Sequence, residues 1–552
     1  MANLINIGLS GLRASQAALN TTSNNISNSD TEGYNRQIVN LKQLPGSSSA
    51  EGYFGNGVNV QGIARQYEGY ISTQLNEAKS EQGAYNTQLT QMSQIDNVLA
   101  NDESGLSTMM ANFFSSLQSL SNTPTDPAVR ETLLGNAQSM VAQFNSVSNY
   151  LGDMETGVES QLDDAVSQIN SYTDQISNLN KQITLTTART GEAPNDLLDQ
   201  RDLFVSKLSE LTSVDVIEQN GKYNVSLPTG QSLVLGEKSF KMAVEDSDED
   251  PTRKTLALVN SSGNSVELNE KRLDGGVIGG LLGFRNEGLT DAQGRLGQIA
   301  VALGGALNEQ HEAGFDLNGD AGKALFTFDE PSSYSNANND GTATLSTTFS
   351  GDYSEVKASN YTVTYDGGDY MVTRDSDNST TTFSAASLPN NADGDPVMTL
   401  DGLNIAVSGT PQDGDSFVVK PTENAGRSLA LALSDAAELA AAGSSGSLGD
   451  NTNAQAMADL QGGLTVGGTT SFSGAYAQLV SNAGTETAAL KVKSSAQDSV
   501  VNQISTAQQS VSGVNLEEEA ANLLKYQQLY TANAKVIGTA QNLFNTLIGI
   551  MG

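Results

Sequence analysis

Both ends of the chain carry an apolar repeat of seven residues, the spacing found in helices that pack against a partner helix. Because seven residues make nearly two helical turns, each repeat places its apolar side chains along one face. We expect the partner of each helix to be the other end of the same chain or a neighbouring copy. That arrangement is more typical of filament-building proteins than of enzymes. The repeats consist of Ile5, Leu12, Leu19 and Ile26, with Leu9 between the first two, and of Leu516, Leu523, Tyr530, Ile537 and Phe544.

The closing helix has a defined start in the sequence. Asn515 stands at the N-cap position, and Glu518, three residues on, completes a capping-box pattern. Glu517 and Glu519 add negative charge at the positive end of the helix dipole. These signals predict a helix that begins near Leu516 and carries its apolar face nearly to the end of the chain.

Charge and composition exclude several classes of function. The 552 residues hold 28 Lys and Arg against 63 Asp and Glu, a net charge of −35. We therefore expect no nucleic-acid partner, because phosphate binding needs clustered Lys and Arg. The chain has no cysteine, so it has no disulfides and no thiol chemistry. No apolar run approaches the roughly 18 residues that span a bilayer, so we expect no membrane insertion.

The interior alternates between helical and β-type sequence. Heptad-like repeats over 71–99 and 158–183, and the N-cap signal Asp126-Pro127, predict long helices up to about Thr212. Short β-type runs with Asn-Gly and Thr-Gly turns follow. The Ala-rich tract 429–442 is predicted to be helical, and the acidic run 245–250 to be a solvated loop.

These patterns predict a multidomain α + β protein with terminal coiled-coil helices, a core bundle of long helices and inserted β-rich domains. The bundle is interrupted twice by β-type sequence, so its helices come from three separate parts of the chain. The expected domains are terminal helices (1–70 with 512–552), a helical core (71–212 with 275–315 and 424–511), a small β module (213–274) and a β-rich outer module (316–423).

The sequence offers no motif for catalysis, cofactor binding or metal binding. His311 is the only histidine, which excludes a His-pair metal site, and no nucleophile motif flanks it. We expect a structural role for it. Asp316, Asn318 and Asp320 alternate like the start of a calcium loop, but Thr327 stands where that loop needs its bidentate Glu. A polar turn is therefore expected there.

Several segments resemble a known family. Residues 24–36 are similar to the N-terminal signature of bacterial flagellar rod, hook and hook-associated proteins, with Ser27 where Ala is usual and Glu32 where Pro is common. Residues 512–530 resemble the closing helix of these proteins. The segments Asn195–Asp202, Leu281–Arg285 and Gly449–Ala454 narrow the resemblance to the hook-associated protein 1 family. The residues that carry the signature are Asn24, Asn25, Asn28, Thr31, Gly33, Tyr34 and Arg36.

The resemblance implies a non-enzymatic structural protein of the extracellular flagellum, an adaptor ring of identical subunits that joins hook to filament. It implies the hook protein below, the second junction protein above, and an export chaperone on the C-terminal helix. It also implies type III export without a cleaved signal, and the first twelve residues show no Lys or Arg and no cleavage site. The residues expected to carry assembly are Ile5, Leu9, Leu12, Leu19, Ile26, Leu516, Leu523, Tyr530, Ile537, Phe544 and Leu547.

Two alternatives remain open at this point. A hook- or rod-type axial subunit would share the N-terminal signature but would polymerise into a long tube. The segments 195–201 and 449–454 argue against it. The region 330–420 could also be an adhesive or carbohydrate-binding module carried on an axial scaffold, which a glycan-binding assay of that fragment would reveal.

Overall fold

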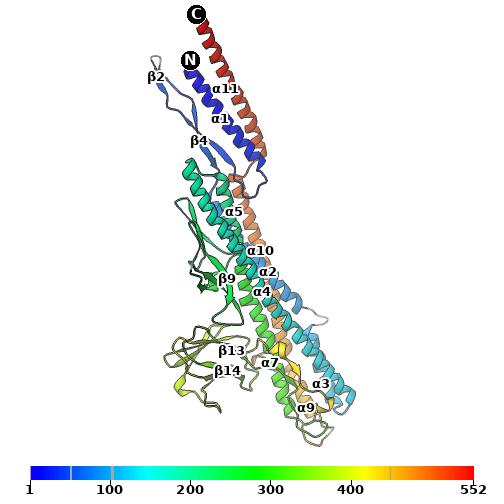
Figure 1. The fold of residues 1–552 in the computed structure, drawn as a ribbon. Coiled ribbons are helices and arrows are strands. Elements are labelled where there is room, and N and C mark those ends of the chain that lie inside the picture. Colours follow the sequence, from blue (N-terminus) through cyan, green and yellow to red (C-terminus); the bar gives the residue numbers. More distant parts are fainter. Residues whose placement is uncertain (1, 50–51, 101–104, 261, 448, 552) are drawn as a thin grey trace.

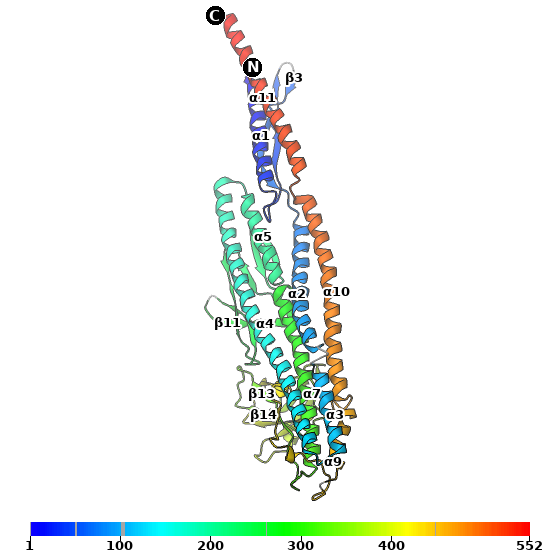
Figure 2. The same ribbon diagram turned by 90° about the vertical axis from the view of Figure 1, so that its right-hand side faces the viewer.

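The computed structural model describes residues 2–49, 52–100, 105–260, 262–447 and 449–551. The molecule is elongated, with long helices along its main axis and both termini at one end (Figure 1). The sheets formed by residues 213–274 and 316–423 lie along one side of these helices, and α2 and α10 run side by side (Figure 2). The expected multidomain α + β fold is confirmed. The helices are α1 (Ala2–Ser27), α2 (Gly69–Leu99), α3 (Leu106–Asn122), α4 (Pro127–Thr190), α5 (Asn195–Leu211), α6 (Gly276–Gly283), α7 (Thr290–Glu312), α8 (Ala425–Ser428), α9 (Thr452–Asp459), α10 (Phe472–Ser512) and α11 (Leu516–Met551).

The longest helix, α4, is one continuous rod of 64 residues, because strong signals define both of its ends. The Asp126 carboxylate accepts a hydrogen bond from the N–H of Ala128 at 2.9 Å, and Pro127 occupies the first turn. Gly191 ends the helix with φ = +77°, a conformation that favours glycine. The apolar face predicted by the repeat at 158–183 is buried in the core of the bundle.

The first β module lies between α5 and α6. It contains a four-stranded sheet in the order β5-β6-β7-β8 and a three-stranded sheet in the order β11-β10-β9. Its buried apolar residues join those of the long helices in one continuous core. Its strands are β5 (Asp215–Gln219), β6 (Lys222–Ser226), β7 (Ser232–Leu235), β8 (Lys238–Ser239), β9 (Lys241–Asp246), β10 (Lys254–Val259) and β11 (Ser265–Glu267).

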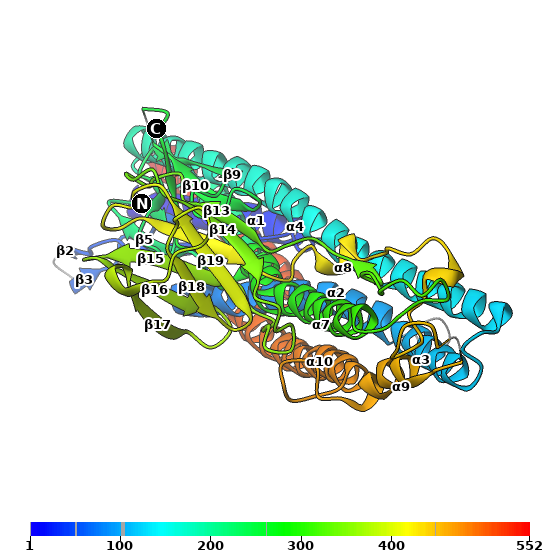
Figure 3. The same cartoon turned by 90° about the horizontal axis from the view of Figure 1, so that it is seen from below.

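The second β module lies beside α7, as the view from below shows (Figure 3). A five-stranded sheet, in the order β13-β20-β15-β16-β17, and a three-stranded sheet, in the order β14-β19-β18, enclose an apolar core of their own. The short strands β12 and β21 pair at its base. The strands are β12 (Phe326–Thr327), β13 (Ser332–Ser335), β14 (Thr344–Phe349), β15 (Tyr361–Asp366), β16 (Asp369–Arg374), β17 (Ser379–Ser384), β18 (Val397–Leu400), β19 (Leu403–Ser408), β20 (Ser416–Lys420) and β21 (Ala430–Leu431).

The prediction of a helix over residues 429–442 is wrong. This Ala-rich tract forms β21, a short 3-10 turn and extended backbone. Its polar backbone groups have partners outside the tract: Nη1 of the buried Arg130 donates to the carbonyls of Ala436 and Leu439 at 3.0 and 2.8 Å. A buried segment must satisfy its backbone groups, and here tertiary partners do so in place of a helix.

His311 is fully buried near the end of α7. Its Nε2 accepts a hydrogen bond from the N–H of Ala440 at 2.9 Å, which leaves the ring proton on Nδ1 to be donated to the carbonyl of Lys323 at 2.5 Å. Burial lowers the pKa of His311 below its ordinary value. The two ring nitrogens join the end of α7 to the backbone of Lys323 and of Ala440, which agrees with the expected structural role.

Apolar periodicity does not predict the β-ribbon that connects α1 to α2. Strand β1 (Gln37–Gln43) pairs antiparallel with β4 (Val58–Arg65), and β2 (Ser47–Ser49) with β3 (Gly52–Phe54) continues the ribbon. The ribbon lies along α1, toward the end of the molecule that holds the termini (Figure 1). The N-terminal region is therefore only partly helical.

The prediction that the acidic run 245–250 is a solvated loop is right only in part: Asp248 and Glu249 are exposed, but Glu245 and Asp246 end β9, and Asp250 is buried against the second β module. The carbonyl of Asp248 accepts a hydrogen bond from the N–H of Ala337 at 2.7 Å. The carboxylate of Asp250 lies 2.8 Å from Nζ of Lys420, and both side chains are largely buried. The run therefore docks one β module on the other.

This contact should depend on pH. Burial disfavours the Asp250 carboxylate, but the Lys420 charge and hydrogen bonds from Thr252 outweigh it and lower the pKa of Asp250. A depressed pKa contributes stability above the unfolded value of about 3.9, and that contribution is lost as the pH falls through the folded value. We expect hydrogen exchange in residues 336–340 to accelerate below about pH 4. Asp250→Asn should show fast exchange already at pH 7, and identical pH profiles for both chains would contradict this.

Candidate assembly interface

The two predicted terminal helices pack against each other as an antiparallel pair. Gly8 of α1 faces α11 so closely that a Cβ there would lie 2.9 Å from Cγ1 of Ile537. A Cβ on Gly11 would lie 2.5 Å from the side-chain oxygen of Asn533. Within one copy, the partner of each terminal helix is thus the other end of the same chain.

This pairing covers only part of the predicted apolar faces. Of the residues expected to carry assembly, those on α1 are half-buried except Leu9, which is exposed. On α11 the face alternates. The half-buried residues are Ile5, Leu12, Leu19, Ile26, Leu523 and Ile537, and the exposed ones are Leu9, Leu516, Tyr530, Phe544 and Leu547.

The last turns of α11 extend beyond the start of α1 (Figure 1). The apolar side chains there have no cover: 51% of Phe544 and 79% of Ile550 are exposed, and Leu543, Leu547 and Ile548 are exposed beside them. Contiguous apolar surface of this kind marks a site of protein–protein contact. We call Leu543–Ile550 the apolar overhang.

The signature residues fold the chain back after α1. The side-chain amide of Asn25 pairs with the backbone of Gln37 in both directions: its Oδ1 accepts from the N–H at 2.9 Å and its Nδ2 donates to the carbonyl at 2.9 Å. The hydroxyl of Tyr34 donates to the same Oδ1 at 2.8 Å. Asn25 therefore substitutes for a strand partner at the start of β1.

The remaining signature residues shape the turn itself. Nδ2 of Asn28 donates to the carbonyl of Asn24 at 3.0 Å, and the hydroxyl of Thr31 donates to Oδ1 of Asn28 at 3.2 Å. Gly33 has φ = +79°, and a Cβ there would lie 3.0 Å from that of Leu203. The position favours glycine for its backbone conformation and for the close approach of α5.

Arg36 joins this fold-back to the start of α11. Its guanidinium lies 2.7 Å from Oε1 of Glu519 through Nη2 and 3.1 Å from Oε2 of Glu518 through Nη1. Nδ2 of Asn25 donates to the other Glu519 oxygen at 3.2 Å. Only 2% of the Glu519 side chain is exposed, so this is a buried ion pair. We call Asn25, Arg36 and Glu519 the terminal clamp.

The predicted N-cap is confirmed, with a different role for Glu518. Oδ1 of Asn515 accepts hydrogen bonds from the N–H groups of Glu517 and Glu518 at 3.0 and 3.3 Å. The Glu518 side chain bonds Arg36, whereas a capping box would turn it back to Asn515. The helix start is thus fixed by its own cap and by the N-terminal signature.

A second polar contact joins the fold-back to α5. The Asp199 carboxylate accepts from Nδ2 of Asn35 at 2.6 Å and from Nη1 of Arg65 at 2.9 Å, and Arg65 also reaches Asp202 at 2.5 Å. Burial raises the pKa of Asp199 above its ordinary value despite these hydrogen bonds. Burial, followed by the charges of Asp199 and Glu519, raises the pKa of Tyr34 to about 12.

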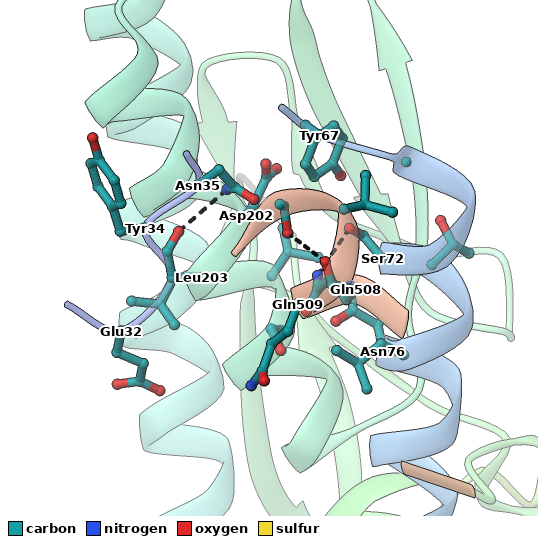
Figure 4. A pocket seen from close by; sticks show the side chains of 18 of the residues that line it. Glu32, Tyr34, Asn35, Tyr67, Ser72, Asn76, Asp202, Leu203, Gln508 and Gln509 are labelled. Carbon is teal, nitrogen blue, oxygen red and sulfur yellow. Dashed lines mark hydrogen bonds between the residues drawn. The ribbon is translucent and has the colours of Figure 1, made fainter. Parts of the chain in front are cut away.

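Between the fold-back, α2, β5 and the α10–α11 junction lies an open groove of about 1310 Å³ (Figure 4). Gln508 of α10 lines the groove and donates to the hydroxyl of Ser72 of α2 at 3.2 Å. Its lining mixes polar and apolar side chains, including Val216 and Leu516.

In the part of the chain that the structure describes, no three His, Asp or Glu side chains are placed to hold a metal ion. Asp316 accepts the N–H groups of Asn318 and Asp320 at 2.8 and 2.9 Å, which is the expected polar turn. Among the described residues, no helix is both long and apolar enough to cross a membrane.

The family signature predicts that Asn25 and Arg36 are functional residues. The sequence does not predict that both bind Glu519, and it does not point to Arg65. The sequence marks Glu519 only as a charge near the helix dipole, and its burial depends on a contact 483 residues away in sequence. Arg65 carries no local motif. The sequence signal for these contacts is the run of three Glu in the first turn of α11.

Segments from near the beginning to near the end of the chain match families of flagellar proteins. Residues 92–326 match the family described as flagellar hook-associated protein FlgK helical domain, and residues 334–421 match the D2-like domain of flagellar hook-associated protein 1. Residues 5–35 match the flagella basal body rod protein family, and residues 507–550 the C-terminal family of the rod proteins FlgEFG.

Individual relatives align with all or most of the chain. The chain is 43% identical to flagellar hook-associated protein 1 of Salmonella typhimurium and 42% identical to that of Escherichia coli, with 100% of each chain covered. The structure of the flagellar hook junction protein FlgK from Burkholderia pseudomallei superposes with a TM-score of 0.74 at 30% identity, covering 80% of this chain and 100% of that one.

Proposed function

This chain belongs to the flagellar hook-associated protein 1 family, and on that premise we propose that it is a structural subunit of the ring that joins the flagellar hook to the filament. The observation that carries the proposal is the uncovered apolar face of α11, which ends in the apolar overhang. A monomer gains nothing from exposing these side chains, whereas a ring of copies can bury them.

We further propose that the terminal helices form the innermost layer, the long helices the next, and the β modules the outside. This arrangement follows the division into domains expected from the sequence. It agrees with the position of both termini at one end and of the two β modules along one side of the long helices (Figures 1 and 2). The partners would be other copies, the hook protein and the second junction protein. No enzymatic activity is part of the proposal.

The exposed face of α11 also suits the binding of an export chaperone before assembly. A chaperone that covers Leu516, Tyr530 and Phe544 would keep the apolar surface from associating too early. Export to the cell exterior without a cleaved signal, as the family resemblance implies, would then end in release of this helix at the growing tip.

Electron microscopy of flagella tests the proposal. Cells that lack this protein are complemented with the full-length chain or with a chain from which residues 530–552 are removed. We expect hooks in both strains and filaments only with the full-length chain. Filaments that grow normally on hooks of the truncated strain would contradict the proposal. That result would favour the alternative of an axial scaffold that carries an adhesive outer module.

A further inference from the structure

Strand β5 is an open sheet edge. It pairs with β6 on one side and with no strand of the described chain on the other. All five of its residues are exposed, and 64% of the Ile217 side chain is accessible. An exposed edge strand with apolar side chains readily pairs with another strand, and monomeric proteins normally protect such edges.

The hydrogen-bonding groups on this edge can be assigned. The two-residue turn Asn220-Gly221 makes Gln219 and Lys222 a hydrogen-bonded pair, so the alternation of an antiparallel ladder turns the backbone of Val216 and Glu218 outward. Tyr223, opposite Glu218, agrees with this assignment. Both its N–H and its carbonyl bond the Asn180 side chain, at 3.0 and 2.8 Å, on the side away from β5.

Beyond Gln37, whose N–H and carbonyl bond the Asn25 side chain, strand β1 presents a second open edge. The N–H of Gln66 donates to the carbonyl of Arg36 at 2.8 Å, which sets the alternation along the β1–β4 ladder. The register shift between Asn40 and Leu41 lies on the β4 side, so β1 itself stays regular. The backbone groups of Val39 and Leu41 consequently point away from β4.

The two edges are complementary in charge and in apolar character. Leu41 is 51% exposed and Lys42 is exposed beside it; no ion pair involving Lys42 is found among the described residues. On β5, Val216 lies next to the exposed acid Asp215. Within one copy the edges cannot meet, because the ribbon runs from the groove toward the termini, away from β5 (Figure 1).

We propose that β1 of one copy adds to β5 of a neighbouring copy as an antiparallel strand, with Leu41 opposite Val216 and Lys42 opposite Asp215. The new ladder extends the four-stranded sheet of one subunit by the ribbon of the next and occupies the rim of the groove. This inference rests on the proposed assembly into a ring of copies. It adds a contact that does not involve the terminal helices.

Disulfide cross-linking tests the register. Asn40 of one copy then faces Ile217 of the other in a non-hydrogen-bonded pair, with Cα atoms about 4.5 Å apart. That separation suits a disulfide, and the natural chain has no cysteine to compete. Junctions isolated from cells that make Asn40→Cys/Ile217→Cys should yield a ladder of covalent multimers after mild oxidation. Either single variant should remain a monomer.

A matched control keeps the cysteine at position 40 and places the second cysteine at a different exposed apolar residue of the same sheet. Asn40→Cys/Leu235→Cys carries its second cysteine on β7, where Leu235 is 54% exposed, and should give no multimers. Multimers of equal yield in this control would mean random collision and would overturn the proposal. A cross-link from either introduced cysteine of Asn40→Cys/Ile217→Cys to a different axial protein would overturn the assignment of a second copy as the occupant.

The outcome is separable from that of the proposed function. Suppose that cells making Asn40→Cys/Ile217→Cys attach filaments normally, but the oxidised chains migrate only as monomers on a gel. That result would refute strand addition and would leave the proposed ring intact. If the double variant builds no junctions, purified full-length Asn40→Cys and Ile217→Cys chains are mixed at high concentration. Disulfide dimers should then form only in the mixture, and their absence would equally refute the inference.

Discussion

Replacing Ile537 and Phe544 with aspartate should abolish filament attachment while the rest of the molecule stays folded. Phe544 belongs to the apolar overhang, and Ile537 lies one heptad before it, against α1. In the proposed ring both side chains are buried between helices. An unpaired carboxylate buried in such a place costs several kcal/mol, about 3–5 when a charge is left without its partner. At about 1.4 kcal/mol per tenfold, two such charges should lower attachment by far more than a hundredfold.

The stability of the long-helix core should not change in this variant. Among the described residues, the apolar core of the long helices contains no residue of α1 or α11. The thermal midpoint of the purified variant should therefore match that of the natural chain within a few degrees. Electron microscopy would count the hooks that carry filaments.

Gln528→Asp/Asn542→Asp is the matched control for this variant. It introduces the same two charges on the same helix, outside the apolar overhang and on the face opposite Ile537 and Phe544, where both side chains are exposed. Filaments should attach to most hooks in this strain. Equal loss of filaments in both strains would mean that charge anywhere on α11 prevents export or assembly, and the apolar face would lose its assigned role.

The parts of the fold that sequence predicts are those in which local signals suffice. The length of α4 follows from apolar periodicity with a cap at Asp126, and the start of α11 follows from Asn515. Both signals lie within a few residues of the structure that they determine. The strands β5 and β6 follow in the same way from the turn at Asn220-Gly221.

The parts that sequence does not predict depend on contacts between distant segments. The tract 429–442 has the composition of a helix, yet Arg130 binds its carbonyls from some 300 residues away. The run 245–250 has the composition of a solvated loop, yet Lys420 buries Asp250. In each case groups on separate elements, a basic side chain among them, bind the segment and hold it in its observed conformation. Local propensity carries no information about such a partner.

The terminal clamp depends most strongly on such a distant contact, and removing its cation should release the start of α11. In Arg36→Met the Glu519 carboxylate stays buried with only the amide of Asn25 as a partner. Breaking a buried ion pair in this way costs about 3–5 kcal/mol. Amide hydrogen exchange in residues 516–523 should therefore accelerate by roughly a hundredfold or more. The exchange of α4 should stay unchanged, because its core is separate.

The double variant Arg36→Met/Glu519→Met distinguishes a buried charge from lost packing. With both charges gone and similar volume retained, the exchange of residues 516–523 should return most of the way to its natural rate. Glu518→Gln is the second control, because Glu518 is 59% exposed and an exposed pair contributes about 1 kcal/mol or less. If Arg36→Met accelerates exchange no more than Glu518→Gln does, the clamp does not hold the two ends of the chain together.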